Sequence, residues 1–256
     1  MNSSQKKVLI TGGSDGIGKA LAQRFISTGH RVIATGRNLQ KLEQAATEIP
    51  GLEIFENDIS KSDEREKLAT YIEQHMPGID VLINNAGIQR RIALADDNAS
   101  WPERQNEIDI LLSAPIHLNH LFIPILLKNG QPSLIVNVTS GGAFIPQVFA
   151  PVYSACKAAL HSYTMTLRHS LEETNCRVIE LIPPAVQTGL ATGNTSHGAP
   201  LEAFADSIFS KLLRENVIEI GYGPTENISI EISGKPLNEV FKAGAQRFAV
   251  KKYHQP

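Results

Sequence analysis

The sequence predicts an α/β fold, with a doubly wound parallel sheet and helices on both of its faces. Short apolar runs alternate along the chain with longer stretches of helical periodicity, a pattern typical of parallel strands joined by helices. A glycine-rich turn separates the first apolar run from the first helical stretch. The length of 256 residues suits one domain spanning residues 1–256, and neither a linker nor an internal repeat interrupts it.

The elements follow one another in strict alternation as far as residue 220. Apolar runs predict strands at residues 7–11, 31–35, 52–56, 81–84, 134–139, 177–182 and 217–220. Helical periodicity predicts helices at residues 17–28, 39–49, 63–75, 102–127, 152–173 and 201–214. The tail is less regular: residues 225–234 suggest a loop or an edge strand, and residues 237–248 a final helix.

The turn after the first strand reads T-G-x-x-x-G-x-G, from Thr11 to Gly18. A strand, a glycine turn and a helix together place a pyrophosphate against backbone N–H groups at the helix N-terminus. Ligands of doubly wound sheets bind beyond the strand C-termini, where this motif falls. A glycine cluster of this kind is also compatible with an ordinary turn, so the motif needs support from the rest of the chain.

Tyr153 and Lys157 are four residues apart, so on a helix they share one face and the ammonium can reach the phenol. A nearby cation favours the phenolate, which would lower the phenol pKa from its ordinary value near ~10 toward neutral pH. Ser140, on another element, can hold a carbonyl oxygen against that phenol. The three side chains suit proton transfer in a carbonyl–alcohol reaction. The spacing alone also arises by chance on exposed helices.

These motifs occur in one order with Asn84-Asn85-Ala86-Gly87, and together they resemble the classical short-chain dehydrogenase/reductase family across essentially the whole chain. The stretches at residues 152–162 and 182–190 resemble its DltE-type subgroup. The resemblance implies a Rossmann-type sheet and an NAD(P)-dependent oxidoreductase that acts on CH–OH groups. It implies that Tyr153 is the general acid or base, that Lys157 lowers its pKa and contacts the nicotinamide ribose, and that Ser140 polarises the carbonyl.

The resemblance also implies a set of cofactor-binding residues. Asp58 matches a residue that contacts the adenine, the Asn85 turn lies against adenine and ribose, and Val186 with Thr188 matches the segment that binds the nicotinamide amide. In isolation, Asp58 and Asn85 would be read as ordinary turn residues. The full implied set is Gly12, Ser14, Asp15, Gly16, Ile17, Gly18, Arg37, Asp58, Ile59, Asn85, Ala86, Gly87, Tyr153, Lys157, Pro183, Val186 and Thr188.

Arg37 bears on the choice between the two nicotinamide cofactors. The second strand ends without the carboxylate that an NAD site usually places near the ribose 2′-hydroxyl. The planar guanidinium of Arg37 suits a 2′-phosphate instead, although a solvated arginine near a helix start is the simpler alternative. Asp15 counts against a phosphate because a carboxylate would repel it. We therefore expect NADP(H) to be preferred, with NAD(H) as the alternative cofactor.

One member of the family's catalytic group is missing. Relatives carry an asparagine on the long helix, which bends that helix and holds a water next to the lysine; the matching residue here is Leu111. Three interpretations stay open: an active reductase with a slower or rerouted proton relay, a deliberately altered position, or a regulatory or accessory protein that binds cofactor with weak or no catalysis. The intact Ser140, Tyr153 and Lys157 favour activity, and we expect Leu111→Asn to maintain or raise turnover.

Composition argues against several other classes. A net charge of -2 gives no electrostatic reason to expect nucleic acid or an anionic membrane, and no uninterrupted apolar run approaches the length that spans a bilayer. The polar start and the two cysteines predict a cytoplasmic protein without disulfides. A metal site is not expected, and the histidines at positions 117, 120, 161 and 169 are interpreted as helix-surface or interface residues.

Partners are expected to be a small carbonyl or alcohol substrate and further copies of the chain. The resemblance implies a homodimer or homotetramer formed through the helices at residues 102–127 and 152–173. It also implies a substrate pocket lined by residues 88–92, 141–151 and 190–201, of which the middle loop is apolar. Arg90 and Arg91 could bind an acidic group, but adjacent arginines are more often solvated.

Overall fold

The computed structural model describes residues 5–128, 130–190 and 198–248, and within them it contains a seven-stranded parallel sheet. The strand order is β3-β2-β1-β4-β5-β6-β7, with the chain reversing direction across the sheet after β3. The strands are β1 (Lys7–Thr11), β2 (Arg31–Gly36), β3 (Glu53–Glu56), β4 (Val81–Asn84), β5 (Ser133–Val138), β6 (Cys176–Ile182) and β7 (Glu219–Gly221). The predicted doubly wound sheet is confirmed.

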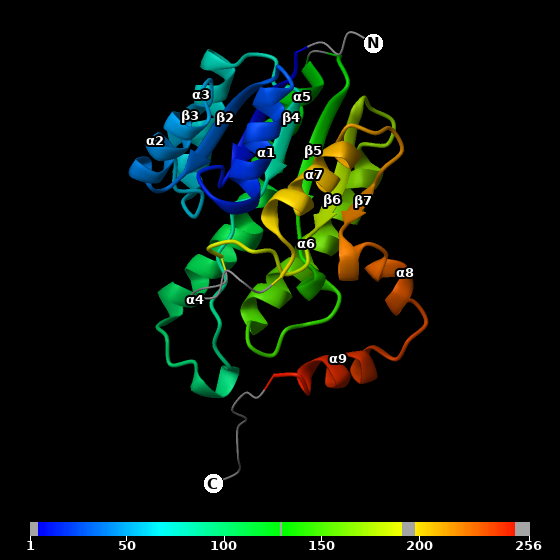
Figure 1. Ribbon diagram of the computed structural model, residues 1–256. Coiled ribbons are helices and arrows are strands. Elements are labelled where there is room, and N and C mark those ends of the chain that lie inside the picture. Colours follow the sequence, from blue (N-terminus) through cyan, green and yellow to red (C-terminus); the bar gives the residue numbers. More distant parts are fainter. Residues whose placement is uncertain (1–4, 129, 191–197, 249–256) are drawn as a thin grey trace.

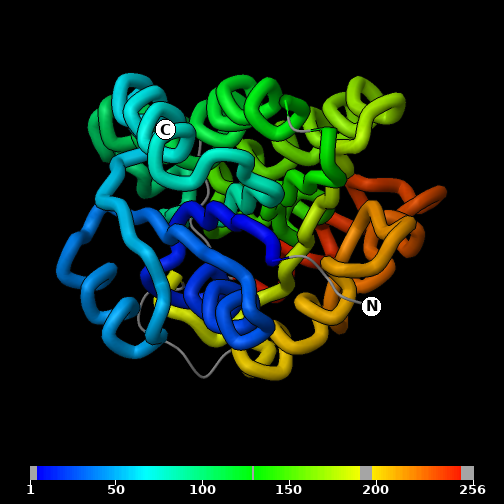
Figure 2. Tube along the Cα trace, turned by 90° about the horizontal axis from the view of Figure 1, so that it is seen from above, coloured from blue at the N-terminus to red at the C-terminus, as the bar shows by residue number. Residues whose placement is uncertain are grey.

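Two layers of helices cover this sheet because successive strand residues point to opposite faces. Val8 and Ile10 pack into one apolar cluster, whereas Leu9 between them packs into the other. The first face carries α1 (Gly16–Ser27), α2 (Leu39–Glu48) and α7 (Leu201–Leu212). The second carries α3 (Ser62–His75), α5 (Ala114–Lys128) and α6 (Pro151–Ser170), so the sheet runs between two sets of helices (Figures 1 and 2).

The long helix predicted at residues 102–127 is broken into three parts. It comprises α4 (Trp101–Ile108), a π-helical turn at Asp109–Ser113 and α5. Ser100 and Glu103 form a reciprocal capping box that starts α4. A π-turn inserts an extra residue into the helix and redirects it, and such turns recur at functional sites. Leu111 lies at the middle of this turn.

The same region, Trp101–Lys128, is long and apolar enough by length and composition to cross a membrane. Half of its most apolar stretch is buried inside the protein. Leu118, Phe122 and Leu126 pack against the central strands, and Pro124 lies within the helix. This helix is therefore part of the core of an α/β fold.

The C-terminal segment passes beneath the end of the sheet where the strands terminate (Figure 1). The Thr225 hydroxyl donates to the carbonyl of Ile182 at 2.6 Å and anchors the turn after β7. Residues 225–234 hold a short helix, α8 (Ile228–Ile232), so the expected loop or edge strand is wrong. The turn at Thr225 explains the difference, because it takes the chain out of the plane of the sheet before a strand could pair. The final helix, α9 (Leu237–Ala245), agrees with the prediction.

Candidate active site

The glycine turn after β1 packs tightly against the turn after β4. Gly12 has a φ of +66°, which favours glycine, and a Cβ on it would lie 2.7 Å from Ala86 Cα. A Cβ on Gly18 would overlap the carbonyl oxygen of Gly12 and lie 2.5 Å from Asn85 Nδ2. Both positions therefore need glycine. The turn places the start of α1 directly after β1, as a phosphate-binding turn requires.

Hydrogen bonds hold these two turns together. Asn85 Nδ2 donates to the carbonyls of Thr11 and Gly12 at 3.0 and 3.1 Å. The Thr11 hydroxyl accepts from the backbone N–H groups of Asn85 and Ala86, both at 3.1 Å. The residues predicted from the glycine motif and from Asn-Asn-Ala-Gly thus form one unit. In this ligand-free geometry the amide of Asn85 shapes the turn.

Arg37 follows β2 and is exposed, beside the glycine turn. A Cβ on the preceding Gly36 would lie 3.3 Å from Ser14 Oγ, which shows how close the strand end is to this turn. Within the described part of the chain Arg37 makes no ion pair with a carboxylate. Asp15 caps α1 by accepting from Gly16 N at 2.7 Å, and Lys41 Nζ lies 3.3 Å from its other oxygen. Lys41, which the sequence did not indicate, thus offsets the charge of Asp15.

The remaining predicted contacts lie along the same edge of the sheet. Asp58 Oδ1 accepts from the backbone and hydroxyl of Ser60 at 3.1 and 2.8 Å, so it has the turn role that was its alternative reading. A Cβ on Gly16 would lie 3.3 Å from the side chain of Thr188, which brings that segment to the glycine turn. Two further predicted residues, Ile59 and Val186, are buried.

Ser140, Tyr153 and Lys157 come together where β5 ends. All three are buried, and Ser140 lies close enough to Tyr153 to act on the pKa of its phenol. Lys157 Nζ donates to the carbonyl of Val138 at 2.6 Å and lies 5.7 Å from the centre of the Tyr153 ring. Gly142 N donates to Ser140 Oγ at 3.1 Å, so the serine oxygen is held from the loop side as well. The predicted trio is one constellation.

The electrostatics of the trio differ from the expectation. Burial raises the pKa of Tyr153, while the Ser140 hydrogen bond acts in the opposite direction and the nearby Glu107 adds to the rise. Burial also lowers the pKa of Lys157 to about 8. The expected net lowering of the phenol pKa does not hold in this geometry, because desolvation of the phenolate dominates. The phenol is therefore held in its protonated form.

Leu111 has a packing role that the sequence did not indicate. Its side chain is buried and clusters with Ala150, Tyr153 and Cys156. It also lines a small cavity shared with Lys157 and Asn84, with room on the order of one water molecule. The Asn84 amide nitrogen donates to Asn119 and Asn137, whereas its oxygen is buried without a partner among the described residues. The π-turn thus persists without the family's asparagine.

Leu111→Asn is expected to separate stability from turnover. Loss of apolar packing and burial of an amide should lower the free energy of unfolding by about 3 kcal/mol. Turnover per folded molecule should stay level or rise, because the amide would face the cavity beside Lys157. Urea denaturation and kcat, both measured below the variant's transition, check this. A large fall in kcat of the folded variant would mean that Leu111 positions the Tyr153 ring.

Two of the predicted substrate loops meet, and α9 covers them. Gln89 Nε2 donates to Gln147 Oε1 at 3.0 Å across the loops. The Arg91 guanidinium lies 4.2 Å from the centre of the Phe149 ring, and the Phe149 ring lies 4.5 Å from that of Phe248 just after α9. This contribution from the tail was not predicted. Most of the third loop, residues 191–197, lies outside the described residues.

Arg90 is not free to bind an acidic substrate group. It pairs with the nearly buried carboxylate of Asp97 at 3.0 Å, which makes it part of the loop's own structure. Glu107, another residue that the sequence did not indicate, is buried and accepts from the backbone of Arg90 at 3.3 Å. Burial raises its pKa. An isolated glutamate in a helix gives no sequence signal of burial, so only the fold could identify it.

The interpretation of His161 as a surface or interface histidine also needs correction. Its Nδ1 lies 2.8 Å from Oε2 of Glu180, whose side chain is completely buried in β6. His169, on the same helix, does pair at the surface, with Glu172. Among the described residues no three His, Cys, Asp or Glu side chains gather in a metal-binding arrangement.

Comparison with known proteins agrees with this geometry. A family model described as short chain dehydrogenase matches residues 6–198. The chain is 43% identical over 190 residues to the uncharacterized oxidoreductase DltE of Bacillus subtilis, covering 74% of this chain and 75% of that protein. It is 33% identical over 184 residues to serine 3-dehydrogenase of Agrobacterium fabrum, covering 71% and 72%.

Among solved structures, a metagenomic short-chain oxidoreductase in complex with NADP superposes with a TM-score of 0.72. That likeness covers 84% of this chain and 95% of the other, at 26% identity. The match of the family model to most of the chain, the parallel sheet with its glycine turn, and the relatives named as oxidoreductases all agree. The chain belongs to the short-chain dehydrogenase family.

Proposed function

We propose that the protein is an NADP(H)-dependent oxidoreductase that interconverts a small carbonyl compound and its alcohol within a single domain. The observation that carries the proposal is the buried grouping of Ser140 and Tyr153 at the end of β5, with the Lys157 ammonium 5.7 Å from the centre of the Tyr153 ring. A paired serine and phenol can hold a carbonyl oxygen between them. The raised pKa of Tyr153 keeps the phenol protonated, which suits a proton donor in the direction of reduction.

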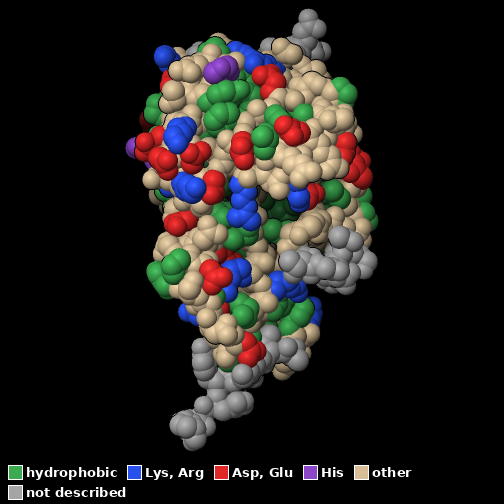
Figure 3. All heavy atoms as spheres, turned by 90° about the vertical axis from the view of Figure 1, so that its left-hand side faces the viewer, with side chains coloured by type: hydrophobic (Ala, Val, Ile, Leu, Met, Phe, Trp, Pro, Cys, Tyr) green, Lys and Arg blue, Asp and Glu red, His purple; other side chains and the backbone are tan. Residues whose placement is uncertain are grey.

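The residues present fit a nicotinamide dinucleotide. Gly12 and Gly18 lie where a Cβ would collide with neighbouring atoms, and Asp15 caps the N–H of Gly16. The N–H groups that follow at the start of α1 would bind a pyrophosphate. Arg37, Asp58 and the Asn85 turn would hold the adenosine end. Thr188 and Lys157 would hold the nicotinamide end. The surface is hollowed between the part that holds the sheet and the part below it, and Lys and Arg side chains lie beside the hollow (Figure 3).

The proposed reaction divides between the bound cofactor and the side chains of the protein. When bound, the nicotinamide supplies or accepts the hydride. Tyr153 holds the proton at its phenolic oxygen and delivers it to the substrate oxygen, where negative charge develops. Ser140 donates to the same oxygen and orients it. The Lys157 ammonium, anchored on the Val138 carbonyl, favours the phenolate once the proton has left. The apolar residues around Tyr153 exclude water from this exchange.

The preference for NADP(H) rests on Arg37 and Lys41. An exposed guanidinium beside the turn suits a 2′-phosphate, and Lys41 offsets the carboxylate of Asp15 that would otherwise repel it. One structural relative holds NADP and another holds NAD, which supports a nicotinamide dinucleotide and leaves the preference to these two side chains.

Replacing Arg37 by alanine is expected to weaken NADPH binding by about 10- to 100-fold, as the loss of a charged hydrogen bond implies. NADH affinity should change by less than about threefold, because the 2′-hydroxyl carries no charge. Fluorescence titration of both cofactors measures the two effects. Arg214→Ala, an exposed arginine after α7, is the matched control. Equal losses for both cofactors, or tighter NADH binding by the wild type, would contradict the preference.

The proposed reaction is tested with a panel of small aldehydes and ketones under NADPH, with Tyr153→Phe as the inactive reference. Turnover that the variant lacks supports the reductase. Tight NADPH binding without turnover on any carbonyl favours the second candidate, a cofactor-binding accessory protein. The observation behind that alternative is Leu111, an apolar side chain in the wall of the cavity beside Lys157.

We also propose that the protein is cytoplasmic and forms homodimers or homotetramers through α4, α5 and α6. The apolar stretch within Trp101–Lys128 is only half buried in one chain, and Met165 on α6 is 52% exposed. Association of copies through these helices would bury that surface.

A further inference from the structure

Glu180 is a fully buried carboxylate on β6, the strand next to the edge of the sheet. It lies on β6 between β5 and β7, and its side chain has no exposed surface. By strand alternation it faces the α6 side with Val178, while Ile179 and Leu181 pack into the opposite cluster. An aliphatic residue would satisfy the packing at this position. A buried charge is costly unless it is paired, so its partners indicate its role.

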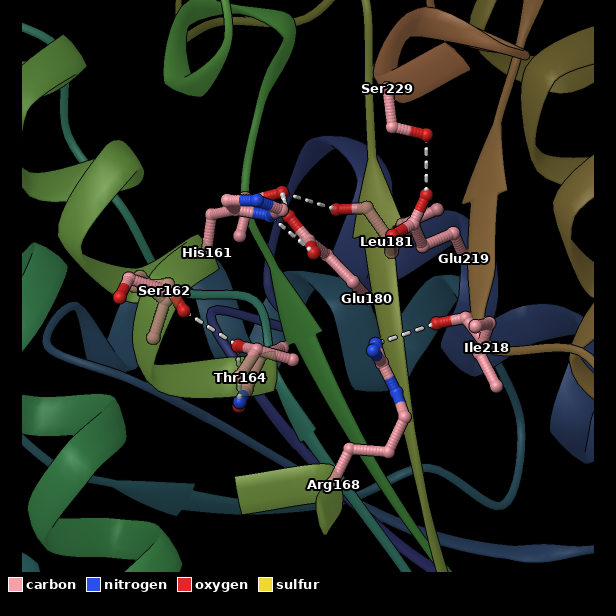
Figure 4. A network of polar contacts seen from close by, with 12 residues as sticks. His161, Ser162, Thr164, Arg168, Glu180, Leu181, Ile218, Glu219 and Ser229 are labelled. Carbon is pink, nitrogen blue, oxygen red and sulfur yellow. Dashed lines mark hydrogen bonds and ion pairs between the residues drawn. The ribbon is translucent and has the colours of Figure 1, made fainter. Parts of the chain in front are cut away.

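The two oxygens of Glu180 have different partners (Figure 4). Oε1 accepts from the Thr139 hydroxyl at 2.6 Å, and Oε2 pairs with His161 Nδ1 at 2.8 Å. His161 lies on α6 one turn after Lys157, and 23% of its side chain is exposed. Its ring also packs against Phe144 at 4.6 Å between ring centres. The pair therefore joins a buried strand to the loop that follows Ser140.

Thr139 connects this pair to the proposed catalytic group. It stands between Val138, whose carbonyl accepts from the Lys157 ammonium, and Ser140, which acts on the pKa of Tyr153. Its backbone N–H is already bonded to the carbonyl of Leu181. Its hydroxyl lies 2.6 Å from the Glu180 carboxylate and 3.3 Å from the carbonyl of Leu181, so the carboxylate is the nearer acceptor that orients the side chain. A shift of Thr139 would move the Lys157 anchor and Ser140 together.

Charged groups from three elements surround His161. Glu180 on β6 and Glu219 on β7 favour its imidazolium form, while Arg168 on α6 and partial burial oppose it. Glu219 is the strand partner of Glu180 and accepts from Ser229 at 2.9 Å. The bond to Glu180 is the largest influence and raises the pKa of His161. Loss of the His161 proton would leave Glu180 without its counter-charge, and Glu180 also acts on Lys157.

We propose that His161 and Glu180 form a titratable positioning pair that, through Thr139, holds Ser140 and the Lys157 anchor in place. The inference rests on the proposed function for its effect on turnover. His161 and Glu180 are positioning residues, since they touch neither substrate nor cofactor. As the pH rises through the pKa of His161, the pair loses its compensating charge and the ionisation of the Tyr153–Lys157 group shifts.

His161→Asn is the sharpest variant, because the Asn amide can donate from about the position of Nδ1 but cannot titrate. It should keep kcat within about tenfold of the wild type and remove one ionisation from the pH profile of kcat. Thr139→Val should lower kcat by about 10- to 100-fold with unchanged NADPH affinity, as expected for misplaced reacting groups. Thr139→Ser should restore it. His169→Asn alters an exposed His–Glu pair on the same helix, and it should change neither kcat nor the pH profile of kcat.

A second readout needs no turnover. In protein labelled at the tyrosine 13Cζ, Tyr153→Phe assigns the Tyr153 signal, and its titration reports the phenol pKa. This titration should shift in Thr139→Val and Glu180→Gln but stay unchanged in His169→Asn, and the His161 ring pKa should fall in Glu180→Gln. An unchanged phenol titration in Thr139→Val, or a His161→Asn profile identical to the wild type, overturns the inference. If the wild type shows no carbonyl turnover, the proposed function is overturned. The phenol titration still decides whether His161 and Glu180 act as a positioning pair.

Discussion

Replacing Tyr153 by phenylalanine is expected to lower kcat for carbonyl reduction by about 10²- to 10⁴-fold, the usual contribution of a positioned general acid. The change removes one oxygen atom and leaves the buried ring in the cluster with Leu111 and Cys156. Ser140 then has no phenol to share the substrate oxygen with. Since the pyrophosphate turn and Arg37 are untouched, NADPH affinity should stay within about threefold of the wild type.

Stopped-flow or steady-state kinetics at saturating NADPH measures this loss. The matched control is Tyr163→Phe, which removes a partly buried hydroxyl from the same helix, ten residues after Tyr153. The control should retain kcat within about threefold. A Tyr153→Phe variant that keeps more than about a tenth of the wild-type kcat would show that another group, such as the buried Glu107, delivers the proton.

The parallel sheet was predictable because its physical cause is local. Each strand is an apolar run, and each run precedes a helix whose apolar residues recur at the helical period. The glycine turn was predictable from its residue types and spacing, although the atoms that exclude a Cβ at Gly12 and Gly18 include Ala86 and Asn85 from a distant turn. Strand runs, helical periodicity and the glycine motif can all be identified from residue types and their spacing.

The features that the sequence did not indicate depend on contacts between distant segments. His161 resembles a surface histidine until β6 brings Glu180 against it, 19 residues further along the chain. The π-turn at Leu111 and the helix α8 arise where packing overrides the local pattern. The upward shift of the Tyr153 pKa has the same origin, because its largest cause is burial by surrounding elements, which the four-residue spacing to Lys157 does not reveal.

Gly18→Ala is expected to destabilise the protein and to abolish tight cofactor binding. The added methyl group would overlap the Gly12 carbonyl and press on the Asn85 amide, which itself holds Thr11 and Gly12. The Gly12 backbone and the hydrogen-bonded Asn85 amide cannot both move away from the added methyl group, so the turn must open. Overpacking of this kind costs about 1–3 kcal/mol, and the displaced N–H groups should weaken NADPH binding by about 100-fold or more.

Gly244→Ala separates this effect from a general response to added methyl groups. Gly244 lies in α9, and a Cβ there would meet Ile145 Cγ2 at an ordinary 3.4 Å. Alanine in a helix should raise the free energy of unfolding by about 0.5–1 kcal/mol and leave NADPH affinity unchanged. Urea denaturation and fluorescence titration of both variants give the comparison. If Gly18→Ala bound NADPH as tightly as the wild type, the start of α1 would not be the pyrophosphate site, and the cofactor assignment built on Gly12, Gly18 and Arg37 would fall with it.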